Sequence, residues 1–110
     1  MIFLTSNPEI DHEIALAELG PDAVGPFPDQ VGLYHMAWEL ADIDELKNAY
    51  QVVLDNKVDV AGFGDHGETK GLYIRDPDGI EIELYAYAPE FEKTPLEEIL
   101  TGGSREVATA

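Results

Sequence analysis

The sequence predicts an α+β fold built on a β-α-β-β-β unit, with a curved mixed sheet and a helix on one face. One strand-like segment is followed by a stretch whose apolar residues recur at helical spacing. Three further strand-like segments come after it, separated by turn signals. At 110 residues the chain is long enough for one buried core and too short for two, so we expect one structural domain.

The first 30 residues are expected to form a hairpin and a linker. Residues 1–5 and 10–18 have strand character and are separated by Ser6-Asn7-Pro8, which is a turn signal. Residues 20–30 are rich in proline and glycine, a composition typical of a connecting segment. The expected organisation is a hairpin over 1–19, a linker over 20–30, a β-α-β-β-β module over 31–88, and a short helix with a flexible tail over 89–110.

The helix of the module is predicted from its ends and from its apolar face. A strand over 31–40 leads to Asp42 and Glu45, which have the spacing of a capping box. The helix is expected over 43–55, and Asn56 is a plausible stop. The apolar positions at helical spacing are Ile43, Leu46, Ala49, Tyr50, Val53 and Leu54.

Three strands are expected after this helix, over 58–63, 69–76 and 80–87. The Gly-rich segment 64–69 separates the first two, and Asp76-Pro77-Asp78-Gly79 is a hairpin turn signal before the third. Thr94-Pro95-Leu96-Glu97 reads as a second capping box with proline at the first helical position, which predicts the short C-terminal helix.

Charge and composition exclude several function classes. Asp and Glu number 23 against 6 Lys and Arg, which gives a formal net charge of −17. Such a surface repels phosphate, so nucleic acid and anionic membranes are poor partners. The chain has no cysteine, which excludes disulfides, thiol catalysis and cysteine-based metal centres. With no signal-peptide pattern and no long apolar run, the expected location is the cytoplasm.

His35 and Glu83 are the first candidates for a site. Side chains alternate along a strand, so His35 shares the less apolar face of its strand with Ala37, and Glu83 shares the equivalent face with Glu81. A histidine and a carboxylate that face one cavity suit a divalent metal, although two ligands do not hold a transition metal. The alternative is a structural histidine and a solvated glutamate.

The same segments resemble the second module of the vicinal oxygen chelate superfamily, which includes glyoxalases, bleomycin resistance proteins and extradiol dioxygenases. The resemblance lies in GLYHMAWEL (32–40), the following helix, and GDHGETKGLYIRDPDGIEIELYAY (64–87). It covers residues 31–87 strongly and 1–18 moderately. It implies that His35 and Glu83 are metal ligands, with Fe(II) expected first and Mn(II), Ni(II) or Zn(II) as alternatives.

Within this superfamily the sequence is most similar to extradiol dioxygenases. His12 lies where those enzymes carry an active-site acid or base, and His66 and Tyr73 lie where they contact substrate oxygens. Glyoxalase-like members carry a glutamate ligand near Ala15, and alanine cannot bind metal. The resemblance therefore implies a catechol-type ring-cleaving dioxygenase acting on a small aromatic or vicinal-oxygen substrate. The structural alternatives are a buried His12, a turn residue at His66 and simple strand packing at Tyr73.

One feature departs from this family pattern. The usual first histidine ligand comes from the opening strand of a first module, and this chain begins after that strand and its helix, so 1–19 would be a remnant. The chain is then a fragment of a longer protein, a binding module that has lost the metal site, or a homodimer that pools His35 and Glu83 from two copies. A non-catalytic small-molecule binding module and, with a shared four-ligand site, a glyoxalase-like isomerase are the alternative functions.

Overall fold

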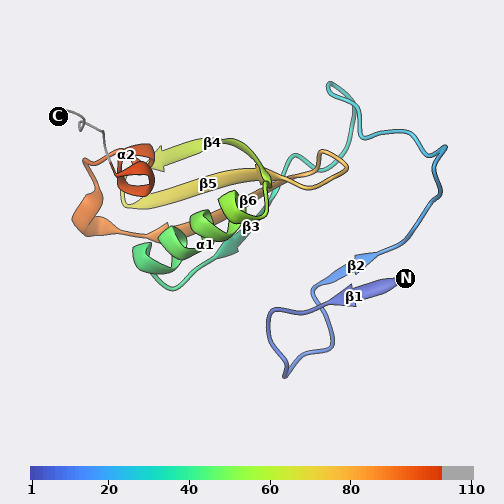
Figure 1. Ribbon diagram of the computed structural model, residues 1–110, viewed down its shortest axis with the longest axis horizontal. Coiled ribbons are helices and arrows are strands. Elements are labelled where there is room, and N and C mark those ends of the chain that lie inside the picture. The colour runs from blue at the N-terminus through green and yellow to red at the C-terminus, as the bar shows by residue number, and fades with distance from the viewer. Residues whose placement is uncertain (103–110) are drawn as a thin grey trace.

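The computed structural model describes residues 1–102, and the tail predicted for 103–110 lies outside the described residues. A four-stranded sheet with one helix across one face forms the main body, and a two-stranded hairpin lies apart from it (Figure 1). The elements are β1 (Ile2–Leu4), β2 (Ile14–Leu16), β3 (Met36–Glu39), α1 (Ile43–Asp55), β4 (Asp59–His66), β5 (Thr69–Arg75), β6 (Glu81–Tyr87), a 3-10 turn η1 (Pro89–Phe91) and α2 (Leu96–Thr101).

The sheet has the order β3-β6-β5-β4, so the first and last strands of the module are direct neighbours. β3 runs parallel to β6, while β4, β5 and β6 form antiparallel pairs. The predicted α+β fold with a mixed sheet is therefore confirmed. Because β3 and β6 pair directly, side chains near the start of β3 lie beside side chains in the first half of β6.

α1 begins and ends where the local sequence predicts. The carboxylate of Asp42 accepts a hydrogen bond from the Glu45 backbone N–H at 2.9 Å, and the Glu45 side chain accepts one from the Ala41 N–H at 2.9 Å. The Asn56 side chain bonds back to the Val52 carbonyl at the other end. The core lies between α1, the sheet and α2, and its fully buried apolar residues are Ile43, Leu46, Val53, Leu72, Ala86, Ala88 and Leu96. In contrast to its predicted place on the apolar face, Leu54 is exposed.

Among the strand boundaries that differ from the prediction, those of β3 and β4 affect the site. β3 begins at Met36 rather than at residue 31. Its partner β6 begins at Glu81, and residues 76–79 before it form a turn, so residues 31–35 have no strand to pair with. β4 extends to His66, and Gly67, with φ of 70°, and Glu68 form a tight turn into β5. His66 is therefore the last residue of a strand rather than part of a longer loop.

The capping box predicted at Thr94 is wrong. α2 begins at Leu96, and no side chain next to it in the sequence caps it. Its first N–H donates instead to the Asp65 carboxylate at 2.9 Å. The same carboxylate oxygen accepts a hydrogen bond from Lys70 Nζ at 2.8 Å, and the Lys70 side chain is only 1% exposed. An ion pair from the β4–β5 hairpin, between the buried Lys70 ammonium and the partly exposed Asp65 carboxylate, therefore fixes the start of α2.

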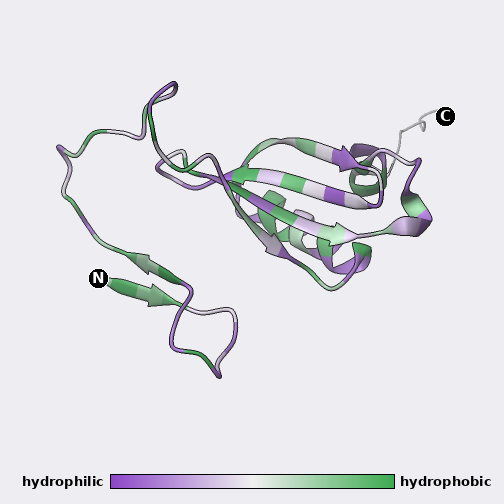
Figure 2. Ribbon diagram, turned by 180° about the vertical axis from the view of Figure 1, so that it is seen from behind, coloured by the Kyte–Doolittle hydropathy of each residue, from purple (hydrophilic) through white to green (hydrophobic). Residues whose placement is uncertain are grey.

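The N-terminal hairpin is small and mostly exposed. β1 and β2 pair over three residues each, and β2 is shorter than the strand predicted over 10–18. Hydrophobic residues occur along both strands and in the segment that follows them (Figure 2). The radius of gyration is 16.2 Å, against about 13 Å for a compact chain of this length. Within residues 1–102, no helix is long and apolar enough to cross a membrane.

Candidate functional site

The structure brings His35 and Glu83 together on the sheet face opposite α1. His35 directly precedes β3, and Glu83 lies in the middle of β6, opposite Ala37 of β3. His35 Nε2 is 3.3 Å from Glu83 Oε1, and the two side chains are 24% and 13% exposed. The sheet register thus places a ring nitrogen and a carboxylate oxygen close enough to share one ligand, as the alternation of side chains indicated.

Gly71 provides the space that the Glu83 carboxylate occupies. A Cβ atom added at Gly71 would lie 2.1 Å from Glu83 Oε2 and 3.0 Å from the carboxyl carbon. No side chain other than hydrogen fits there without moving Glu83. The conformation of this carboxylate therefore depends on a glycine in the neighbouring strand β5.

Tyr73 completes one wall of the site. It lies opposite Glu83 in the β5–β6 register, and its ring meets the His35 ring edge to face, with centroids 5.5 Å apart. Burial raises the pKa of the Tyr73 hydroxyl above its ordinary value of 10.0, and the negative charge of Glu83 raises it further. Tyr73 is therefore a protonated hydrogen-bond donor at neutral pH.

His66 lies further along the same face. A Cβ atom at Gly64 would lie 3.3 Å from both His66 Nε2 and the Tyr73 hydroxyl, so both side chains reach over this glycine. Gly64 pairs with Gly71 between β4 and β5. The space above the two glycines is filled by the side chains of Glu83, Tyr73 and His66, which therefore lie over the backbone of β4 and β5.

His12 does not join this group in the structure. Its Nδ1 lies 2.6 Å from Asp11 Oδ2, and its ring packs against Phe3 with centroids 4.5 Å apart. Both partners belong to the N-terminal hairpin. His12 is more than one third exposed, so it is neither buried nor in contact with His35 or Glu83.

Glu81 is a further neighbour of His35, which the family resemblance does not indicate. Its Oε2 lies 3.8 Å from His35 Nδ1, and its Oε1 lies 3.8 Å from Arg75 Nη2. The alternation along β6 already places Glu81 on the face of Glu83. Its contact with His35 depends on the β3–β6 pairing, which the sequence alone does not reveal.

His35 and Glu83 fit two positions of a divalent metal site. Both are ordinary ligands for such ions, and Gly71 keeps room for the carboxylate. Among the residues that the structure describes, no group of three or more His, Cys, Asp or Glu side chains is placed to hold a metal ion. The described part of the chain, residues 1–102, thus offers a pair of donors, and a stable transition-metal centre needs further ligands.

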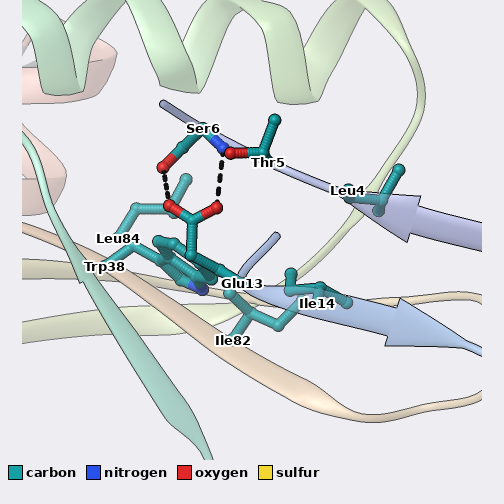
Figure 3. Close-up of a pocket in the computed structure, with 8 residues that line it drawn as sticks. All are labelled: Leu4, Thr5, Ser6, Glu13, Ile14, Trp38, Ile82 and Leu84. Carbon is teal, nitrogen blue, oxygen red and sulfur yellow. Dashed lines mark hydrogen bonds between the residues drawn. The ribbon is translucent and has the colours of Figure 1, made fainter. Parts of the chain in front are cut away.

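A separate cavity of about 290 Å³ lies on the opposite side of the sheet, where the hairpin approaches it (Figure 3). Glu13 accepts hydrogen bonds there from the Ser6 backbone N–H at 3.0 Å and from the Ser6 hydroxyl. These bonds lower the pKa of Glu13. The residues that line the cavity are mostly apolar: Leu4, Thr5, Ser6, Glu13, Ile14, Trp38, Ile82 and Leu84. Trp38, Ile82 and Leu84 alternate with the residues of the His35 face, so this cavity is distinct from it.

Comparison with known proteins shows relatives that carry dioxygenase names. The chain is 39% identical to catechol-2,3-dioxygenase from Bacillus subtilis (strain 168) over 77 residues, which are 69% of this chain and 27% of that protein. It is 34% identical to biphenyl-2,3-diol 1,2-dioxygenase 3 from Rhodococcus globerulus over 99 residues, or 86% of this chain and 50% of that protein. The chain thus spans half or less of the length of these relatives.

The fold has similar neighbours among solved structures. The crystal structure of a glyoxalase/dioxygenase from Nostoc punctiforme superposes with a TM-score of 0.51 at 27% identity, covering 62% of this chain and 49% of that one. The sequence profile of the Glyoxalase/Bleomycin resistance protein/Dioxygenase superfamily matches residues 1–84. On this match and on the fold, the chain belongs to the Glyoxalase/Bleomycin resistance protein/Dioxygenase superfamily.

Proposed function

We propose that this chain forms part of a metal-dependent extradiol dioxygenase that acts on catechol-type substrates, with His35 and Glu83 as metal ligands. The observation that carries the proposal is the approach of His35 Nε2 to Glu83 Oε1 at 3.3 Å, over the space left by Gly71. The relatives named as catechol and biphenyl-diol dioxygenases support the substrate class.

Superfamily membership suggests a divalent metal, with Fe(II) first and Mn(II), Ni(II) or Zn(II) as alternatives. His35 would bind it through Nε2 and Glu83 through a carboxylate oxygen. A bound divalent ion of this kind supplies Lewis-acid and redox chemistry toward two adjacent substrate oxygens and dioxygen. The acidic character of the chain favours cation binding in general, because its net charge is −17.

The remaining residues of the face orient the substrate. Tyr73 keeps its proton at neutral pH and donates a hydrogen bond toward a substrate oxygen beside Glu83. Gly64 and Gly71 leave room for the Tyr73, His66 and Glu83 side chains, over which a flat aromatic ring would lie. His66, beside Tyr73 over Gly64, contacts the distal part of the substrate. His12 contributes to this site only in an oligomer in which the N-terminal hairpin of one chain lies at the His35–Glu83 site of another chain.

A second copy of the chain supplies the missing ligands in this proposal. A closed two-fold dimer that joins the open faces brings two copies of His35 and two of Glu83 to one axis. The unpaired edge of β3, next to His35, and the exposed apolar residues of the N-terminal segment support association. If the chain is instead a piece of a longer protein, the rest of that protein supplies the ligands.

Oxygen uptake tests the proposal directly. The protein is loaded anaerobically with Fe(II), mixed with catechol or 2,3-dihydroxybiphenyl, and followed with an oxygen electrode and by the absorbance of the ring-opened product. We expect coupled oxygen uptake and product formation that His35→Ala and Glu83→Ala abolish. Glu39→Ala is the matched control, because Glu39 lies exposed on the same sheet face without touching His35. Iron-loaded protein that consumes no oxygen with either substrate would contradict the proposal.

One observation favours a second function, a non-catalytic small-molecule binding module. The described part of the chain has no three-ligand cluster, yet it has the apolar cavity beside Trp38. Trp38 is the single tryptophan, so its fluorescence reports ligands in that cavity. Quenching by aromatic compounds in metal-free protein, without oxygen uptake after iron loading, supports this function. Isomerisation of a vicinal-oxygen substrate by Ni(II)- or Zn(II)-loaded dimers would point to a glyoxalase-like isomerase instead.

A further inference from the structure

His35 has one ring nitrogen that the proposed metal site leaves unused. Its Nδ1 is buried and is the one buried side-chain nitrogen or oxygen within residues 1–102 that lacks a hydrogen-bond partner. A neutral imidazole carries one N–H and one lone pair, so a metal on Nε2 requires the proton to stay on Nδ1. A buried N–H without an acceptor is costly, so the group that faces Nδ1 matters.

Glu81 is the group that faces this nitrogen. Its Oε2 lies 3.8 Å from His35 Nδ1, whereas Glu83 Oε1 lies 3.3 Å from the other ring nitrogen, Nε2. It is held from its other side by Arg75, whose Nη2 lies 3.8 Å from Glu81 Oε1 and which pairs with it in the β5–β6 register. Glu81 thus lies between Arg75 and His35, with Oε1 toward the guanidinium and Oε2 toward the ring nitrogen. The 3.8 Å between Oε2 and Nδ1 is longer than a hydrogen bond, so the proposed bond requires the two groups to move closer.

We propose that Glu81 is a positioning residue whose carboxylate accepts a hydrogen bond from the Nδ1–H of His35 and thereby presents Nε2, beside Glu83, to the metal. The proposal rests on the proposed metal site at His35 and Glu83. Metal-ligating histidines usually donate their other N–H to a carboxylate or carbonyl, and this bond fixes the ring and strengthens the ligand. Without Glu81, Nδ1 has no carboxylate to accept its hydrogen bond, and the neutral ring carries its proton on Nε2, where it donates to Glu83. A protonated Nε2 has no lone pair with which to bind the metal.

Zn(II) binding by the dimer fraction tests this role, because Zn(II) is diamagnetic and needs no turnover. The affinity is measured by calorimetry, and the His35 Nδ1–H is followed by nitrogen-edited proton NMR in the Zn(II)-loaded protein. We expect Glu81→Ala to weaken Zn(II) binding by about 10- to 100-fold. We also expect it to lose the slowly exchanging, strongly deshielded Nδ1–H signal that the unchanged protein shows.

Two further variants separate positioning from simple loss of charge. Glu81→Gln loses the same charge as Glu81→Ala but keeps an acceptor oxygen, so we expect it to retain the Nδ1–H signal and part of the affinity. Glu39→Gln removes a charge from the same face at a residue that does not contact His35. The Zn(II) affinity of this variant should stay within about threefold of the unchanged protein, since an exposed charge is screened. Equal losses of Zn(II) affinity in the Ala and Gln variants of Glu81 would mean that Glu81 acts through its charge alone, which would contradict a positioning role. Circular dichroism establishes whether each variant is folded. If Glu81→Ala is unfolded, the Zn(II) affinity and the Nδ1–H signal of Glu81→Gln test the role of Glu81.

The outcomes distinguish this inference from the proposed function. Zn(II) binding that His35→Ala abolishes, while Glu81→Ala leaves both the affinity and the Nδ1–H signal unchanged, would overturn the role of Glu81 and keep the metal site. Absence of any His35-dependent Zn(II) binding in the unchanged protein would overturn both.

Discussion

At the scale of single residues, the site depends on how Glu83 is held over Gly71. The carboxylate occupies the position where any larger residue 71 would place its Cβ atom. Such an arrangement requires a specific register between β5 and β6, in which Tyr73 pairs with Glu83 and Gly71 pairs with Tyr85, two residues further along β6. Glycine at this position is therefore a feature of the site as well as of the strand.

Substitution of Gly71 by alanine should disrupt the carboxylate and leave the fold intact. The added Cβ would lie 2.1 Å from Glu83 Oε2, so Glu83 must turn away from His35. We expect metal affinity to fall at least about tenfold and stability to fall by about 1–3 kcal/mol. Calorimetric metal titration and urea unfolding measure the two effects.

Gly62 is the matched control for this substitution. It lies opposite Tyr73 in β4, and a Cβ atom there has nothing within 4 Å. Gly62→Ala should therefore bind metal like the unchanged protein. Equal affinity in Gly71→Ala and Gly62→Ala would show that the position of Glu83 does not determine metal binding.

Tyr73 should ionise at higher pH than an ordinary tyrosine, because burial and the charge of Glu83 raise its pKa above 10.0. A group whose pKa is raised by folding contributes stability below its unfolded pKa and loses it as pH rises through the folded one. We therefore expect Tyr73 to contribute to a fall in stability above pH 10. Absorbance at 295 nm follows tyrosine ionisation, and the Tyr73→Phe variant shows which step belongs to Tyr73. Glu83→Gln should lower the pKa of Tyr73 toward 10. Ionisation of Tyr73 at or below 10 would contradict this environment.

The sequence predicts part of this site for a clear physical reason. Alternation along a strand is a local property, and it correctly places His35 and Glu83 on one face. The roles of Gly71 and Glu81 depend on the register between strands distant in sequence, which no local pattern encodes. The proposed role of His12 depends on contacts beyond a single chain, and within the chain its partners are Asp11 and Phe3.

At the scale of elements, the ion pair between the buried Lys70 and the partly exposed Asp65 links the β4–β5 hairpin to α2. Asp65 Oδ1 accepts from both Lys70 Nζ and the Leu96 N–H, so one carboxylate neutralises a buried ammonium and caps a helix. Asp65 also precedes His66 in the chain. The hairpin end that carries His66 is thereby fixed to the core.

Removal of Asp65 should be among the most destabilising polar substitutions in this chain. Asp65→Ala leaves the Lys70 ammonium buried without its counter-ion, and we expect a loss of about 3 kcal/mol in the free energy of unfolding. Urea unfolding gives the value. Asp65→Ala combined with Lys70→Met should lose less than Asp65→Ala alone, because no unpaired charge stays buried.

Asp59 offers a control for this comparison. It contacts Arg75 at 3.9 Å but is largely exposed, so Asp59→Ala should change stability by no more than about 0.5 kcal/mol. Similar losses in the Asp65 and Asp59 variants would contradict a stabilising role for the ion pair between Asp65 and Lys70.

Elements were predictable where their signals are local. α1 has its N-cap, its amphipathic spacing and its stop within one stretch of sequence, and its predicted bounds match the structure. α2 shows the opposite case, because Asp65, 31 residues away, replaces the predicted capping box. β3 is shorter than predicted because its length is set by its partner β6 rather than by its own apolar run.

At the scale of the whole molecule, the N-terminal third of the chain has little to pack against. Its strands are short, its large apolar residues are exposed, and the chain is more extended than a compact domain of its length. A two-stranded hairpin alone is marginally stable in water. We therefore expect the N-terminal segment to be covered in the assembly that functions.

Limited proteolysis tests this expectation. In dilute monomer, subtilisin should cut first within residues 17–34, where nearly every residue is exposed and few backbone hydrogen bonds form. In the dimer we expect this cleavage to slow at least about tenfold, because the protease reaches a covered segment only when the interface opens. Mass spectrometry locates the cuts. Equal cleavage in monomer and dimer would show that the segment lies outside the interface.

The most direct test of the proposed shared site is metal content against oligomeric state. The protein is reconstituted separately with Fe(II), Mn(II), Ni(II) and Zn(II), separated on a sizing column, and each peak is analysed for metal and protein. A shared two-fold site predicts about half a metal ion per chain, confined to dimers and abolished by His35→Ala. One tightly held metal in each monomer, or no metal in any species, would contradict it.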